Sequence, residues 1–214
     1  MTVTLDTTFR GEDKCSYSNG DLTFTMTATG SDRFTRATEA KSSGKWYWEV
    51  TIGTVGYNDL GVGLADSVFE NDWSFRDSIT YNTWGVSKTG ASGKCFCNSG
   101  TCDGAHAAIV TGMVLGFAWD ADAHELWMSE DGVWNGTGTP NPETGVSPNC
   151  TDATGTLYPC VSASRSSEAY TFNFGGSDFA YTKPSGFDSY DQSTSTTGWD
   201  AATTTTPGSP SWKP

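Results

Sequence analysis

The sequence has few basic residues. Lysine and arginine together number 12 against 25 aspartates and glutamates, which gives a formal net charge of −13 and a pI near 4.3. Affinity for nucleic acid rests mainly on basic side chains that displace counterions from phosphates. The charge balance therefore excludes nucleic acid as an expected partner.

Long apolar runs are also missing. No stretch approaches the roughly 20 apolar residues that a membrane-spanning helix needs. Met1 is not followed by the charged and then apolar segments of a secretion signal. We therefore expect a protein that is made in the cytoplasm without a signal peptide and does not insert into a membrane.

Residues for catalysis are scarce. His106 and His124 are the only histidines, and the sequence contains no G-x-S-x-G or H-E-x-x-H motif. A glycosidase would need one pair of facing carboxylates, and the candidates cluster near predicted hairpin ends: Asp120, Asp122, Glu125, Glu130 and Asp131. Solvated carboxylates are ordinary at such ends, so we expect a non-enzymatic protein with no catalytic residue.

Metal-binding patterns are weak. Cys95, Cys97 and Cys102 form a compact group that a soft metal could bind, but their spacing is not that of paired C-x-x-C motifs. A disulfide from Cys95 or Cys97 to Cys102 and free thiols are equal alternatives if the protein acts outside a cell. Asp120 and Asp122 are weak calcium candidates, although the EF-hand pattern is absent. We expect no metal and no cofactor.

Strand and turn patterns, in contrast, are abundant. Residues 113–119 form an apolar run that is rich in aromatic and β-branched residues and too short to cross a bilayer. Residues 126–129 begin a second strand, and Asp131-Gly132 supplies a turn that tolerates positive φ. Residues 112–134 are therefore predicted to form a hairpin at the centre of an antiparallel sheet.

A second strong prediction is the strand at residues 45–52. Its alternation places Trp46, Trp48, Val50 and Ile52 on a core-facing side, and Lys45, Tyr47, Glu49 and Thr51 on the other. An Asn19-Gly20 turn predicts a hairpin between residues 15–17 and 22–26. Further strands are predicted at residues 33–38, 60–65, 79–86, 94–97, 157–163 and 170–174.

The two ends differ from the body. Residues 1–13 are predicted to be an extended arm, residues 14–187 a single folded domain, and residues 188–214 a Ser/Thr/Gly/Pro-rich tail. The arms lack a core of their own and carry only scattered anchors. We expect them to be ordered only by packing on partner subunits through Phe9, Trp199 and Trp212.

Six segments, in order, resemble the SPRY family. They are GKWYWEVTI (44–52), LGVGLAD (60–66), WGVSKTG (84–90), VLGFAWDADAHELWMSEDGVWNG (114–136), LYPCVSAS (157–164) and FNFG (172–175). The resemblance implies an all-β, concanavalin-like β-sandwich of two bent antiparallel sheets. It also implies binding through loops at one edge of the sandwich, here residues 66–77, Trp84, residues 95–106 and residues 134–138.

A narrower resemblance is to SPRY domains of bacteriophage and prophage structural proteins. KSSGKWYWEV (41–50), DGVWNGTGTPNPETG (131–145) and FAYTKPSGF (179–187) carry it. It implies a virion component, such as a head or tail fibre, spike or decoration protein. The expected partners are other virion proteins, further copies of this chain, and a glycan or protein on the host surface.

Loop aromatics with nearby polar residues suggest glycan binding by stacking and hydrogen bonding. The candidate ligand-binding residues are Trp73, Phe75, Trp84, Trp134 and Asn135. Three alternatives remain open. The aromatics could plug the end of the sandwich, the loops could pack on a capsid or tail partner in a purely structural role, or the loop edge could bind a peptide in a cellular adaptor.

Overall fold

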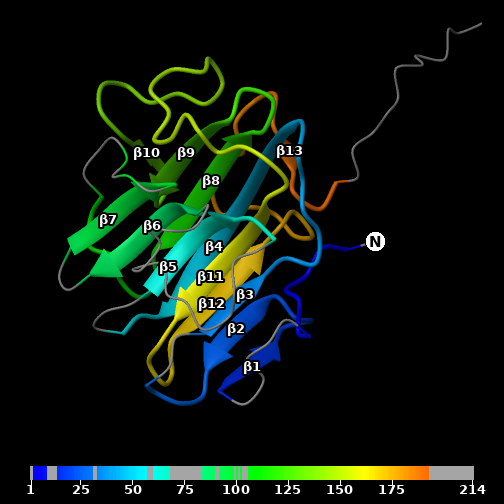
Figure 1. Cartoon of the computed structure of the whole chain (residues 1–214), viewed down its shortest axis with the longest axis vertical. Coiled ribbons are helices and arrows are strands. Elements are labelled where there is room, and N and C mark those ends of the chain that lie inside the picture. The colour runs from blue at the N-terminus through cyan, green and yellow to red at the C-terminus, as the bar shows by residue number, and fades with distance from the viewer. Residues whose placement is uncertain are drawn as a thin grey trace, which may run out of the picture.

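The computed structural model describes residues 2–8, 14–30, 33–56, 60–67, 83–89, 92–98, 100, 102 and 106–192. This part of the chain holds thirteen strands (Figure 1). They are β1 (Cys15–Ser18), β2 (Thr23–Met26), β3 (Arg33–Arg36), β4 (Lys45–Thr54), β5 (Leu60–Ala65), β6 (Thr83–Thr89), β7 (Ser92–Cys97), β8 (Val114–Asp120), β9 (Glu125–Glu130), β10 (Val133–Asn135), β11 (Tyr158–Ala163), β12 (Ala169–Asn173) and β13 (Asp188–Ser189).

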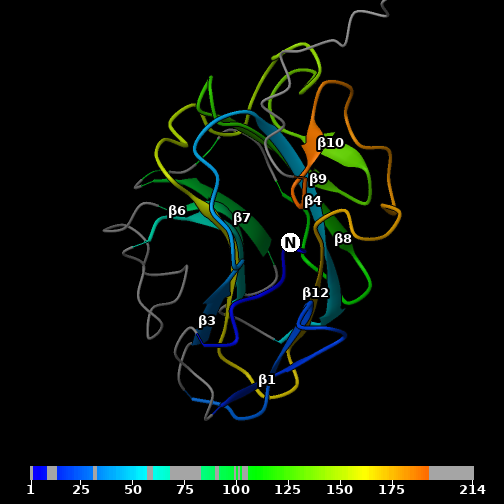
Figure 2. The same ribbon diagram turned by 90° about the vertical axis from the view of Figure 1, so that its right-hand side faces the viewer.

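The strands form two sheets. One has the order β1-β2-β12-β4-β8-β9-β10, with β13 parallel to β4, and the other has the order β3-β11-β5-β6-β7. The remaining strand pairs are antiparallel, and Figure 2 shows the sheets as two facing layers. The predicted all-β sandwich is confirmed. Within the described residues, no helix is long and apolar enough to span a bilayer.

The centre of the larger sheet is the antiparallel pair β4 and β8. Its register places Trp46 opposite Trp119 and Trp48 opposite Phe117. The rings of Trp48 and Phe117 stack with centroids 5.1 Å apart and an interplanar angle of 8°. These large rings exclude water from the space between the sheets, and their burial is the main driving force for closing the sandwich.

The predicted central hairpin is confirmed. Strand β8 pairs with β9 in register from Leu115–Glu130 to Asp120–Glu125. The next turn, between β9 and β10, has Asp131 at φ 47° and Gly132 at φ 79°. This is the left-handed conformation that the Asp-Gly pair was expected to supply.

The outer face of β4 is largely covered, although the sequence pattern did not indicate what would cover it. Tyr47 and Glu49 are only 1% and 2% exposed, because the segment before β13 lies over them. Tyr47 belongs to a second apolar cluster with Ala118, Trp127 and Phe187, against which Trp134 and Phe179 also pack. Strand β4 is therefore buried on both faces along much of its length, a pattern that simple alternation does not predict.

Both ends of the described chain pack on the body. Val3 and Leu5 are each 1% exposed, and the Leu5 amide donates to the Asp21 carbonyl at 2.8 Å. The prediction that the N-terminal arm needs a partner is therefore wrong for residues 2–8, whereas Phe9 lies outside the described residues. Tyr190 is fully buried, so the packed body continues past residue 187 to Gln192. Trp199 and Trp212 also lie outside the described residues.

The stacked Trp48 ring provides a direct test of this core. Trp48→Ala should lower the free energy of unfolding by about 3–5 kcal/mol, because a large cavity would replace the indole. Urea unfolding followed by circular dichroism measures the change. Thr51→Ala, at an exposed position of the same strand, is the control and should cost no more than about 1 kcal/mol. Equal losses in the two variants would contradict the assigned faces.

Candidate functional site

A pocket of about 410 Å³ opens on the outer face of the larger sheet. Tyr47 of β4 and Ser129 of β9 are nearly fully buried and form its floor. The walls come from the β9–β10 turn, strand β10 itself, the loop after β10 and the segment before β13. The wall residues are Gly132, Trp134, Pro140, Asn141, Pro142, Glu143, Tyr181, Thr182 and Pro184.

The loop after β10 is closed by its own backbone. The Asn141 amide donates to the Val146 carbonyl at 2.9 Å, and the reverse bond measures 3.0 Å. The Asn141 side chain accepts from the Glu143 amide at 2.9 Å, as asparagine often does in turns. Trp127 fastens the loop to the sheet through its indole, which donates to the Val146 carbonyl at 3.0 Å. Hydrogen bonds therefore fix the conformation of this pocket wall.

The buried carboxylate of Glu49 holds the opposite wall. Its oxygens accept from the Ala180 amide at 2.7 Å, the Tyr181 amide at 2.9 Å and the Tyr47 hydroxyl at 2.8 Å. A buried carboxylate is tolerated only when such donors satisfy it. The segment that carries Tyr181 is thereby fixed over β4.

The two walls are joined to each other. The Glu143 carboxylate accepts from the Ser185 amide at 2.8 Å, which links the loop after β10 to the segment before β13. Gly132 faces the Tyr181 ring so closely that a Cβ atom at this position would overlap it. The same position has φ 79°, so glycine is required there for both space and backbone conformation.

The pocket offers aromatic and polar groups together. Trp134 is half-buried and meets Tyr47 edge-on at a centroid distance of 6.4 Å, while Tyr181 is 36% exposed. Burial raises the pKa of Tyr47 well above its usual value, and the hydrogen bond to Glu49 and the nearby charge of Glu49 raise it further. Tyr47 therefore stays a protonated hydrogen-bond donor, and the available chemistry is stacking and hydrogen bonding.

Only some of the predicted ligand-binding residues that the structure describes lie at the pocket. Trp134 lines the pocket. The prediction for Trp84 is corrected: this residue lies in β6, has no exposed surface, and donates from its indole to Asp152 at 2.8 Å. The amide nitrogen of Asn135 is also fully buried, which removes it as a donor to a ligand. Trp73 and Phe75 lie outside the described residues.

The aspartates considered for calcium have structural partners. Asp120 pairs with Lys45 at 2.7 Å and accepts from the Asp122 and Ala123 amides at 3.1 and 3.0 Å. Asp122 accepts from the Gly44 amide at 3.1 Å. These carboxylates stabilise the β8–β9 turn and its contact with the start of β4, and neither lines the pocket.

The other carboxylates considered for glycoside hydrolysis also contact neighbouring chain. Glu130 meets the His106 ring nitrogen at 2.9 Å and accepts from the Ala107 amide at 3.1 Å. Asp131 accepts from the Val114 amide at 2.9 Å. Glu125 has a raised pKa because of burial first and the nearby Asp120 second, but it lies outside the pocket described above.

Sequence reasoning missed most of the pocket as a site. Tyr181, Asn141 and Glu143 were not among the predicted ligand residues, although a signal for them existed. Every lining residue except Tyr47 and Ser129 falls in residues 131–145 or 179–187. In the sequence, these ranges are the insertion after the central hairpin and the segment that closes the body.

The Glu49 contacts predict a local effect. Glu49→Gln keeps the side-chain size but turns an N–H group toward one of the donors, so it should cost roughly 2 kcal/mol of stability. Amide hydrogen exchange of residues 179–187 should become faster than in the wild type. Glu125→Gln, the same chemical change at a carboxylate without these contacts, should leave that exchange unaltered. Unchanged exchange in Glu49→Gln would contradict the anchoring role.

Comparisons with known proteins agree with this architecture. A family model described as the SPRY domain matches residues 45–177. The crystal structure of the SPRY domain of human HERC1 has a TM-score of 0.58 at 19% identity and covers 77% of this chain and 94% of that one. The TRIM65 PSpry domain has a TM-score of 0.56 at 13% identity and covers 81% and 92%.

At these identities, the similarity to the two solved structures shows a shared fold alone. The search of curated proteins gave no match. The family model carries the assignment, because it spans more than half of the chain. SPRY domains are typically non-catalytic modules that bind other proteins. The chain belongs to the SPRY domain family.

Proposed function

We propose that this SPRY domain is a non-enzymatic adhesion module whose pocket binds a glycan on a host surface. The observation that carries the proposal is the pocket in which Trp134 and Tyr181 stand beside Asn141, Glu143 and Thr182. Aromatic rings cover the C–H face of a sugar, while polar side chains exchange hydrogen bonds with its hydroxyls. The volume of about 410 Å³ falls within the range of about 300–1,000 Å³ for small-ligand sites.

The charge of the site narrows the class of glycan. Glu143 lies on the wall, and the whole chain carries a formal net charge of −13. A sialylated or otherwise anionic sugar would be repelled both at long range and in the pocket. The preferred ligand is therefore a neutral oligosaccharide.

The proposed location is the virion, in a head or tail fibre, spike or decoration protein. Support comes from the resemblance of residues 131–145 and 179–187 to phage structural proteins. These same two segments supply most of the residues that line the pocket. Other virion proteins would then be the partners that hold the module on the particle.

A protein or peptide ligand is the second candidate. Pro140, Pro142 and Pro184 lie beside Trp134 and Tyr181 on the lining. Such an apolar, aromatic surface also suits a protein interface, in which tryptophan and tyrosine contribute much of the affinity. The general role of SPRY domains in binding proteins favours this candidate as well.

A glycan array tests the first proposal. Neutral hexose and N-acetylhexosamine oligosaccharides should bind, whereas their sialylated counterparts should not. Titration calorimetry with the strongest ligand should show that Trp134→Ala weakens binding about tenfold, the amount expected for one lost aromatic contact.

Val133→Ala is the matched control. Val133 neighbours Trp134 in β10 but is 66% exposed and does not line the pocket, so its removal should leave affinity unchanged. A folded protein that binds no glycan on the array would contradict the proposal. In that case, a photoreactive residue in place of Tyr181 that cross-links to one defined virion protein would support the second candidate.

A further inference from the structure

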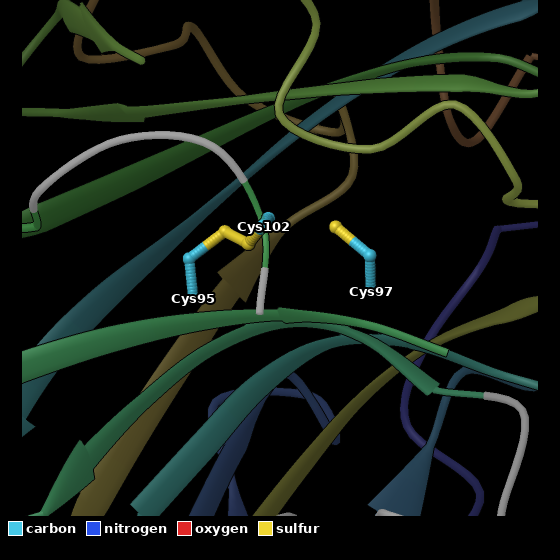
Figure 3. A group of neighbouring side chains, drawn as sticks. All are labelled: Cys95, Cys97 and Cys102. Carbon is cyan, nitrogen blue, oxygen red and sulfur yellow. A yellow bond between two sulfur atoms is a disulfide. The ribbon is translucent and has the colours of Figure 1, made fainter. Parts of the chain in front are cut away.

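Four of the six cysteines are gathered in the core between the two sheets, three from one short stretch of sequence and the fourth, Cys150, from a distant one. Disulfides join Cys95 to Cys102 and Cys97 to Cys150, with Cα–Cα distances of 5.4 and 5.5 Å. The Sγ atoms of Cys95, Cys97 and Cys102 all lie within 4.8 Å of one another. Figure 3 shows the sulfur of Cys97 turned toward the Cys95–Cys102 pair. The two adjoining disulfides form a cysteine cluster in which three sulfur atoms make one compact group and the fourth, that of Cys150, is bonded to Cys97.

The elements that carry these cysteines explain the cluster. Cys95 and Cys97 lie two residues apart in β7, so their side chains share the inner face of the smaller sheet. Cys150 belongs to the connection after β10, whose backbone pairs with Leu126 of β9 in the larger sheet through bonds of 2.9 and 3.1 Å. The cluster thus links the two sheets.

We propose that the four thiols of the reduced protein bind one Zn²⁺ ion in place of the two disulfides. Tetrahedral zinc with Zn–S bonds of about 2.3 Å holds its sulfur ligands about 3.8 Å apart. Three of the sulfurs already lie within 4.8 Å of one another, and the fourth, that of Cys150, is bonded to Cys97. Reduction of the Cys97–Cys150 bond frees the Cys150 side chain to turn toward the other three sulfurs.

The balance of the exchange is simple. Reduction supplies two electrons and two protons to each disulfide, and Zn²⁺ then replaces the four thiol protons to form a tetrathiolate. Thiolates select soft cations over calcium or magnesium. Four protein ligands leave no open position, so the site stabilises structure and performs no catalysis.

The consequence is a cross-link that persists in both redox media. In a reducing cytoplasm zinc would join β7 to the connection that carries Cys150, and in an oxidising medium the disulfides would do so. Asn149, next to Cys150, accepts from the Met128 amide at 2.7 Å and donates to the Asn135 carbonyl at 2.8 Å. The cross-link therefore also supports β10, which carries a wall of the pocket.

Metal titration of the full chain tests the proposal. The protein is reduced with a phosphine in the absence of oxygen, freed of metal with a chelator, and titrated with Co²⁺ and then Zn²⁺. We expect one Co²⁺ per chain with the thiolate charge-transfer and tetrahedral absorption bands, and complete displacement by Zn²⁺. Native mass spectrometry should show one zinc and the loss of four protons.

Single variants identify the ligands. Cys97→Ser and Cys150→Ser should each weaken metal affinity by about 100-fold or more, because each removes one of four thiolates. Cys160→Ala is the control, since Cys160 is buried in β11 outside both disulfides and should not alter binding. Circular dichroism verifies that each variant is folded.

Two results would overturn the proposal. One is a folded, reduced protein that binds no Co²⁺, and the other is an undiminished four-thiolate spectrum in Cys150→Ser. If the reduced chain unfolds without metal, refolding on addition of Zn²⁺ supports the site. Refolding only on oxidation would show that the four cysteines serve as disulfides alone.

Discussion

The structure depends most on the double burial of β4. Its inner face carries tryptophans that stack and pack between the sheets, and its outer face carries Glu49 under the segment before β13. Burial of the rings favours the sandwich through the hydrophobic effect. Burial of Glu49 is tolerated because three donors satisfy its carboxylate, and two of these donors are backbone amides of the covering segment. Core and pocket are thus organised by opposite faces of one strand.

The pocket illustrates how a binding site is added to a common fold. The sheets supply Tyr47 and Ser129 to its floor and Trp134 of β10 to its wall, whereas the rest of the walls comes from connections outside the regular strands. The Glu143–Ser185 hydrogen bond and the close contact of Gly132 with Tyr181 hold these walls together. Because binding residues lie on loops that a rigid scaffold positions, related folds with different loops would bind different ligands.

The cysteine cluster lies between the sheets, on the other side of the larger sheet from the pocket. It joins β7 to the connection that pairs with β9, across the interior between the sheets. Asn149 carries this support onward to β10 through hydrogen bonds to Met128 and Asn135. Glu49 and the cysteine cluster therefore stabilise the pocket from two directions, one through the segment before β13 and the other through β10.

Local sequence determined most of the strands, the inner face of β4 and the Asp131-Gly132 turn, because alternation and turn chemistry involve neighbouring residues. The predicted strand at 79–86 is β6 at Thr83–Thr89, and the short strands β10 and β13 were not predicted. Local sequence did not determine which distant segments cover the faces of the strands. Tyr47 and Glu49 alternate like solvent-facing residues and become buried only when a segment some 130 residues later folds over them. Trp84 has an aromatic ring that could stack on a sugar, but it lies in an inner strand and is fully buried. Cys97 and Cys150 are 53 residues apart, and only the packing of two sheets brings them together.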